Sequence, residues 1–184
     1  MNQGILILHP EKINSHPDAQ QVAQLLLQEG LIGNAIDNMQ NSYSAGESFL
    51  QLITFMGCSP HIRFEPEDEQ DKGYCYITLA ARESLQIRLS EHARPPRCCA
   101  CKKPVGKGWQ TAVLQGELIT CPHCHLQQRP DQLNWRNDSG MGYFFIEIHN
   151  IFPGEAQPVP RLLQQLQGID ASSQWRYFYL HSLG

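Results

Sequence analysis

The sequence predicts an α+β fold, with a mostly antiparallel sheet, helices on one face of that sheet and a small cysteine-rich insert. Three observations support this prediction. Two segments with helical periodicity come first, and several short alternating segments follow them. The hydrophobic fraction of 41% and the charged fraction of 17% are typical of a globular protein. Five of the seven cysteines fall between residues 98 and 124, in two tight groups.

Three segments have the periodicity and the end signals of helices. In residues 15–30, Ser15 is a candidate cap, Pro17 lies at the start, and apolar residues recur at helical spacing. Residues 46–60 contain a second helix that Gly57 and Pro60 stop. A third, short helix occupies residues 158–168, with prolines at its entry and a glycine at its exit.

Six segments are predicted to be strands, because their apolar residues alternate and turn-forming residues bound them. They are residues 4–10, 61–66, 74–80, 85–90, 142–152 and 174–180. The short stretch Ala81–Ser84 predicts a hairpin between the third and fourth of these, and residues 34–45, rich in Asn and Ser, predict a loop.

A proline-rich boundary at residues 93–97 separates the cysteine-rich segment from what precedes it. We therefore predict one body, residues 1–94 with 137–184, and an inserted module, residues 95–136. The charge is uneven between the two parts. Residues 94–136 hold seven basic and two acidic side chains, a net +5, and the rest holds seven and sixteen, a net −9. Such asymmetry indicates either separate partners for the two parts or an ordinary solvated surface.

The cysteine spacing predicts a metal site. Cys98 and Cys101 form one C-x-x-C pair, Cys121 and Cys124 form another, and nineteen residues separate the pairs. This spacing suits a structural Zn²⁺ held by four sulfurs at about 2.3 Å, with no coordination position left for substrate. We expect residues 109–114 and 117–120 to pair as strands around Gln115-Gly116 and to bring the two pairs together.

The two cysteine pairs, the expected hairpin and Pro122 in the second pair resemble the zinc ribbon superfamily over residues 95–136. The resemblance implies one structural Zn²⁺ with Cys98, Cys101, Cys121 and Cys124 as its ligands. It does not imply one activity, since zinc ribbons occur in transcription and translation factors, in enzymes as rigid inserts, and in adaptor proteins. The rest of the chain shows no such resemblance.

Three further side chains near these pairs carry metal-ligating atoms. Cys99 is expected to be a free thiol or a neighbour of the site, because its spacing to Cys101 suits a shared metal poorly. His123 and His125 flank Cys124, but four cysteines already complete the site. If these three groups bound metal together, the chain would have a metal-handling role.

The leading functional hypothesis is a binding module. The insert would present Lys102, Lys103, Lys107 and Trp109 to a partner, which is either protein or nucleic acid. The sequence does not indicate an oligomeric state.

The alternative hypothesis is an enzyme whose insert is only structural. Cys58 would be a nucleophile, or a small buried residue. Glu147 and His149 lie two residues apart on one face of a predicted strand, where they would transfer protons or simply face solvent. Aromatic and basic residues of the predicted sheet would form an outward face that either binds bases or packs under the module; they include Arg63, Tyr74, Tyr76, Arg88, Tyr143 and Phe145.

The chain has no apolar run of the roughly 18 residues that span a bilayer, and residues 4–8 are too short for the core of a signal peptide. We therefore expect a cytoplasmic protein with no membrane partner. In a reducing compartment clustered cysteines hold metal more often than they form disulfides, and an odd number does not suit a closed disulfide framework.

Overall fold

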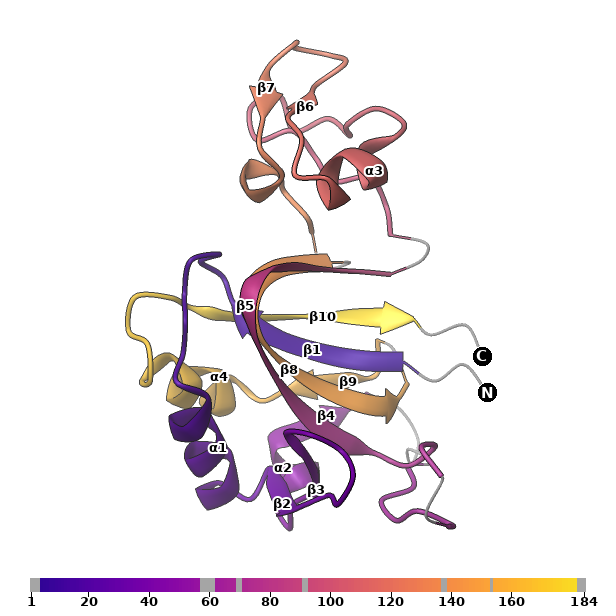
Figure 1. The fold of residues 1–184 in the computed structure, drawn as a ribbon, viewed down its shortest axis with the longest axis vertical. Helices are drawn as coiled ribbons and strands as arrows, with labels where there is room; N and C mark the ends of the chain where they lie inside the picture. Colours follow the sequence, from indigo (N-terminus) through magenta and orange to yellow (C-terminus); the bar gives the residue numbers. More distant parts are fainter. Residues whose placement is uncertain are drawn as a thin grey trace.

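The computed structural model describes residues 4–56, 62–68, 71–90, 93–136, 139–152 and 154–181. The fold is α+β, as predicted. Six strands form one antiparallel sheet in the order β10-β1-β8-β5-β3-β2 (Figure 1). Their bounds are β1 Gly4–Pro10, β2 Ile32–Ala35, β3 Ser42–Ala45, β5 Tyr76–Leu89, β8 Ser139–Ile151 and β10 Trp175–His181.

One face of the sheet carries the main core and the helices. Cys75, Ile77 and Leu79 are buried there with alternate residues of β8, as the alternation predicts. Two helices pack on this face, α1 (Ala19–Gln28) and α4 (Pro160–Gln167). Asp18, rather than Ser15, caps α1, because its carboxylate accepts hydrogen bonds from the first N–H groups of the helix.

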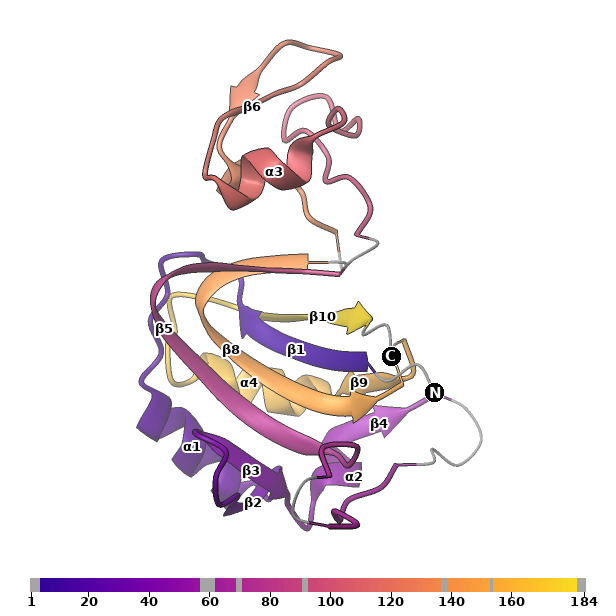
Figure 2. The same cartoon turned by 45° about the vertical axis from the view of Figure 1, so that its right-hand side comes forward.

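The strands β5 and β8 are long and strongly curled (Figures 1 and 2). The predicted hairpin at Ala81–Ser84 is wrong, because β5 continues through this stretch as a bulge and both of its halves pair with β8. The stretch lacks the Gly, Asn or Pro that a tight turn uses, and the continuous apolar strand β8 aligns both halves.

The curl buries the second face of the sheet instead of leaving it open. Ile7, Ala80, Phe145 and Phe178 form a separate buried cluster on this face. The Ser90 hydroxyl at the end of β5 donates to Tyr179 O at 3.1 Å and accepts from His181 N at 3.2 Å, so this end reaches β10. Phe145 therefore lies on the second face, as expected, and its burial there leaves it unable to stack on bases.

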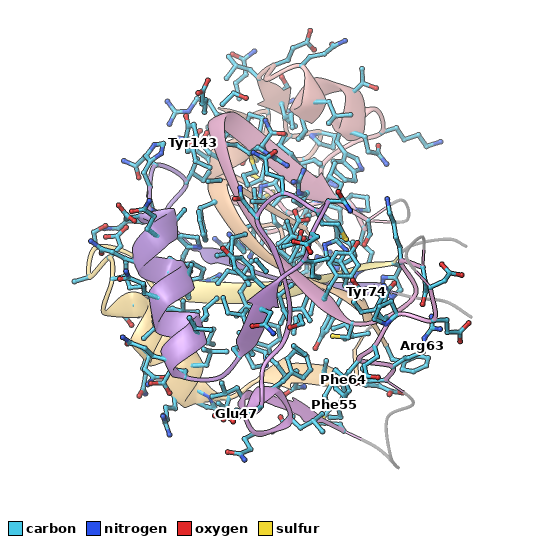
Figure 3. All side chains as sticks on the ribbon, turned by 60° about the horizontal axis from the view of Figure 1, so that its bottom comes forward. Glu47, Phe55, Arg63, Phe64, Tyr74 and Tyr143 are labelled. Atoms are coloured by element: carbon cyan, nitrogen blue, oxygen red, sulfur yellow. The ribbon has the colours of Figure 1, made fainter. Side chains whose placement is uncertain are left out.

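The second predicted helix is mostly wrong. The helix α2 covers only Phe49–Leu52, and the chain then forms strand β4 (Ile53–Phe55), which pairs with β9 (Ala156–Pro158). Two β-branched residues and an aromatic residue favour the extended chain there. Residues 62–66 form no strand. Phe64 packs against the Phe49 ring at 5.5 Å, at the end of the body away from the insert (Figure 3).

The cysteine module, residues 95–136, lies between β5 and β8 and stands beyond the curled end of these two strands (Figures 1 and 2). It contains α3 (Trp109–Leu114), β6 (Ile119–Thr120), β7 (Gln127–Gln128) and the 3₁₀ turn η1 (Pro130–Gln132). Its small core has five buried residues and packs against Ile87 and Leu89 of β5; they are Val105, Trp109, Val113, Ile119 and Leu133.

The predicted pairing of residues 109–114 with 117–120 is wrong. Residues 109–114 form α3, which buries Trp109 and Val113 on one face, four residues apart. The strand β6 pairs instead with β7, which follows the second cysteine pair. Along the described part of the chain, no helix has the length and apolar character needed to cross a membrane.

Candidate metal centre

The four predicted ligands meet in the cysteine module. The sulfur atoms of Cys98, Cys101, Cys121 and Cys124 all lie within 4.8 Å of one another. The Sγ atoms of Cys98 and Cys124 are 3.6 Å apart, as are those of Cys101 and Cys121. A tetrahedron with metal–sulfur bonds of about 2.3 Å has sulfur–sulfur edges of about 3.8 Å. The four sulfurs therefore have the spacing of a tetrahedral thiolate site.

The two cysteine pairs have the same backbone hydrogen bonds. In the first, Lys102 N donates to Cys98 O at 3.1 Å, and Cys98 N donates to Lys103 O at 2.9 Å. In the second, His125 N donates to Cys121 O at 2.9 Å, and Cys121 N donates to Leu126 O at 2.9 Å.

The equivalence extends to an unusual backbone conformation. Lys102 and His125, each four residues after the first cysteine of its pair, have φ angles of 61° and 59°. A non-glycine residue in this left-handed region carries a conformational cost, so its occurrence at both equivalent positions indicates a common requirement. Each turn aims two sulfurs at one point, and together the turns complete the four-sulfur cluster.

Backbone donors stabilise thiolates at the first cysteine of each pair. The N–H groups of Cys101 and Ala100 lower the pKa of Cys98 to about 6, although burial acts against them. Burial raises the pKa of Cys121, but the N–H groups that follow it in its turn outweigh burial and lower the pKa. Thiolate is the form that binds metal, so the turns favour the ligand form of these residues.

The fourth sulfur behaves differently without a metal. The N–H of Leu126 lowers the pKa of Cys124, but burial and the three neighbouring sulfurs together raise it to about 11. Close thiolates repel one another, so one of them retains its proton until a cation neutralises the group. Metal binding therefore releases protons from this cluster.

The other candidate ligands lie outside the cluster. Cys99 is half-buried and its backbone N–H donates to Gln128 Oε1 at 3.0 Å, whereas His123 and His125 are exposed. Sequence reasoning did not select Gln128, whose side chain is almost fully buried beside the first pair. The contact between Gln128 and Cys99 can be recognised only in the fold, because β7 places the Gln128 side chain beside Cys99.

The proposed partner-binding residues divide into two groups. Lys102, Lys103 and Lys107 are exposed, and Lys102 Nζ donates to Cys99 O at 2.5 Å. Trp109 is only 4% exposed and its ring meets Trp135 edge to face at 5.7 Å. Trp109 therefore belongs to the module core, and the expectation that it is presented to a partner is wrong.

Two of the candidate catalytic residues on the body, Glu147 and His149, lie close to each other. Glu147 Oε1 accepts from Arg88 Nε at 2.9 Å, and Arg88 lies 5.2 Å over the Phe145 ring. His149 Nε2 lies 3.6 Å from Glu147 Oε2, too far for a hydrogen bond. Burial opposes ionisation of Glu147, but His149 and Arg88 lower its pKa below the ordinary value. An ionised, ion-paired carboxylate suits a structural role more than that of a general acid.

The remaining candidate residues of the body are less suited to catalysis. The ring of Tyr76 stacks on that of His149 at 4.3 Å, which fixes the imidazole against the sheet. Cys75 is buried in the main core, and this burial raises the pKa of its thiol to about 12. Cys58 lies outside the described residues.

Searches with protein-family models, among curated proteins and among solved structures gave no match for this chain.

Proposed function

We propose that the cysteine module is a zinc-ribbon-like unit that binds one structural Zn²⁺ through Cys98, Cys101, Cys121 and Cys124, and that it serves as a binding module for protein or nucleic acid. The observation that carries the first part is the pair of matching turns that direct four sulfurs to one point. Four thiolate ligands favour Zn²⁺, a divalent metal that has no redox chemistry of its own. A reducing cytoplasm would keep these thiols available to the metal.

The exposed lysines support the second part. Three of the five lysines of the chain lie inside the module, in the six-residue stretch 102–107. None of these three forms an ion pair with another described residue. Four thiolates and one Zn²⁺ together contribute a charge of −2, so residues 94–136 keep a net charge near +3 when loaded. A positive module on an acidic body favours an anionic partner and confines the contact to the module. Nucleic acid is the partner that this charge favours most.

Elemental analysis tests the metal. We expect one zinc per chain in the purified protein and less than a tenth of that in a Cys121→Ser variant. Cys99→Ser is the matched control, because its sulfur lies outside the cluster, and it keeps one zinc. An equal loss in both variants, or no zinc in the unmodified protein, contradicts the assignment.

Fluorescence anisotropy with labelled single-stranded and double-stranded oligonucleotides tests the partner. We expect affinity to fall with salt, and the variant with Lys102→Ala and Lys103→Ala to bind at least tenfold more weakly while retaining its zinc. The control removes the other exposed lysines, Lys12→Ala with Lys72→Ala, which lie on the body. If neither oligonucleotide binds, and a protein captured from cell extract is lost with the Lys102 and Lys103 changes, the partner is a protein instead.

The enzyme and metal-handling alternatives have weaker support. The Arg88–Glu147 pair satisfies the carboxylate of the body candidate, and Cys99, His123 and His125 do not gather at a second metal position. Zinc that exchanges readily with a strong chelator would favour metal handling over a structural ion.

A further inference from the structure

The two cysteine turns differ at their second position. In the first turn this residue is Cys99, which has a backbone N–H, and in the second it is Pro122, which has none. The first turn therefore needs a hydrogen-bond acceptor that the second does not. The acceptor is Gln128 Oε1, which lies 3.0 Å from Cys99 N and comes from β7, the strand after the second pair.

The whole Gln128 amide is enclosed beside Cys98. Gln128 is 1% exposed and Cys98 is 0% exposed. The Cys99 N–H has to meet the amide oxygen, so this contact also decides that the other end of the amide is Nε2. Within the described part of the chain, Nε2 is enclosed and forms no hydrogen bond. An enclosed NH₂ group of this kind requires an acceptor inside the module.

The sulfur of Cys98 is the acceptor that the structure offers. The backbone N–H of Cys101 contributes most to the lowered pKa of Cys98, and the Gln128 side chain acts in the same direction. At Cys121, burial acts against the lowered pKa, and the groups that lower it are backbone N–H groups and other cysteines. Cys98 therefore has one side-chain N–H donor that its counterpart in the second turn does not have.

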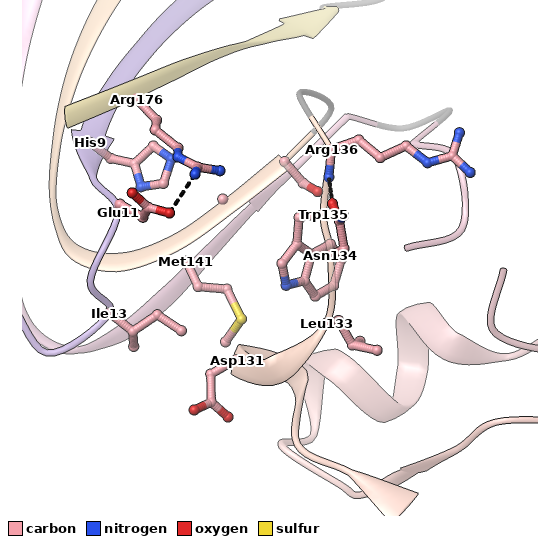
Figure 4. A pocket seen from close by; sticks show the side chains of 12 residues that line it. His9, Glu11, Ile13, Asp131, Leu133, Asn134, Trp135, Arg136, Met141 and Arg176 are labelled. Carbon is pink, nitrogen blue, oxygen red and sulfur yellow. Dashed lines mark hydrogen bonds and ion pairs between the residues drawn. The ribbon is translucent and has the colours of Figure 1, made fainter. Parts of the chain in front are cut away.

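The fold fixes the segment that carries this amide. Gln128 pairs with Ile119 in the ladder between β6 and β7. Further along, Asn134 and Arg97 exchange two backbone hydrogen bonds of 2.9 Å, directly before Cys98. Figure 4 shows Asn134 and Trp135 at this end of the module, where the chain runs from η1 toward β8. The segment is thus bonded to the chain on both sides of the first cysteine turn.

An N–H donor stabilises a thiolate more than a thiol, because the thiolate carries the charge. Cys98 and Cys121 are 0% exposed, so water gives their sulfurs little help. Groups that hydrogen-bond to metal ligands orient those ligands, and their removal typically lowers metal affinity about 10- to 100-fold. The Gln128 amide has the position and the free donor for this role at Cys98.

We propose that Gln128 is a positioning residue of the metal centre: in the metal-loaded protein its Nε2 donates to the Cys98 sulfur, while its Oε1 holds the Cys99 N–H. This role rests on the proposed metal site and adds to it the side chain that orients and stabilises one of the four ligands. A Gln128 side chain that only fills the module core is the competing explanation.

NMR of the full chain loaded with an NMR-active cadmium isotope tests the hydrogen bond directly. Cadmium binds four-thiolate sites, and a proton that is hydrogen-bonded to a ligating sulfur couples to the metal nucleus. We expect such a coupling to a side-chain amide proton of Gln128, assigned through isotope labelling. Couplings to backbone N–H protons of the two turns are the internal control.

The outcomes separate this role from the metal site itself. Backbone couplings without a coupling to Gln128 overturn the role and leave the metal site standing. A purified chain that binds neither zinc nor cadmium contradicts the metal site, and the role of Gln128 with it. A side chain that only fills the core gives no coupling to the metal.

Variants of Gln128 test the consequence for affinity. Gln128→Glu keeps the shape and the oxygen for the Cys99 N–H but loses the donor, so its zinc affinity, measured by competition with a chelator, should fall about 10- to 100-fold. Gln127→Glu is the matched control, because it adds the same charge one position earlier on β7, where the side chain is exposed, and it should change the affinity less than twofold. Equal affinities in the two variants overturn the proposal. If Gln128→Glu does not fold, the cadmium coupling of the unmodified chain decides.

Discussion

The buried imidazole of His9 predicts how acid destabilises the body. Burial lowers its pKa to about 4 and outweighs a backbone hydrogen bond to Pro10, which raises the pKa; the charge of Arg176 adds to the lowering, whereas the ordinary value in an unfolded chain is 6.5. Between these two values the unfolded chain binds the proton and the folded chain does not. Stability must therefore fall as the pH drops from about 6.5 to about 4, and the loss is complete below the lower value.

The structure also sets the size of this loss. Each pKa unit corresponds to about 1.4 kcal/mol, so a difference of about 2.5 units costs about 3 kcal/mol at pH 4. His9→Phe removes the titration while keeping a ring between Phe145 and Phe178. The free energy of unfolding of the unmodified protein, minus that of His9→Phe, should be constant above pH 7 and fall by about 3 kcal/mol by pH 4.

Urea unfolding followed over pH 4–8 measures this difference. Acid also protonates the cysteine cluster, but it does so equally in both proteins, and the subtraction removes that effect. A difference that does not change with pH would refute the reasoning, because it would mean that His9 is not held neutral by the fold. A difference that grows on acidification would show that His9 gains a partner when it is charged.

Two further substitutions test the packing described above. Gly140→Ala would place a Cβ 2.6 Å from Phe178 Cε1 and should cost about 1–3 kcal/mol, seen as a lower melting temperature, whereas Gly106→Ala, with its nearest contact at 3.7 Å, should be nearly silent. Arg88→Ala leaves the mostly buried Glu147 carboxylate without its cation and should cost about 1–3 kcal/mol in urea unfolding. Adding Glu147→Gln should recover part of that loss, and strict additivity of the two changes would show that the pair is not coupled.

The parts that the sequence predicts well are those with a local period or spacing. Apolar residues at 144, 146 and 148 locate the central strand because these alternate positions face the main core, and the spacing of the four cysteines identifies their cluster. The prediction of a strand at residues 109–114 failed because Trp, Thr and Val favour strands. The burial of Trp109 and Val113 on one helical face decides the conformation instead. Tertiary pairing also decided Ala81–Ser84, which has no signal of its own for a bulge.

The packing of His9 against β8 and β10 could not be predicted from the sequence. His9 and Gly140 are 131 positions apart, and they meet only because β1 and β8 are neighbours in the sheet. Neither residue belongs to a motif.

The way the cysteine module joins the body has a mechanical consequence. Leu89 and Ser139 are paired residues at the ends of neighbouring strands, so the module leaves and re-enters the sheet at points only about 5 Å apart. Two connections this close together act as a hinge. They permit rotation of the module about one axis and resist its rotation about any other. Any rotation of the module about this axis has to break the packing of its core against Ile87 and Leu89 of β5.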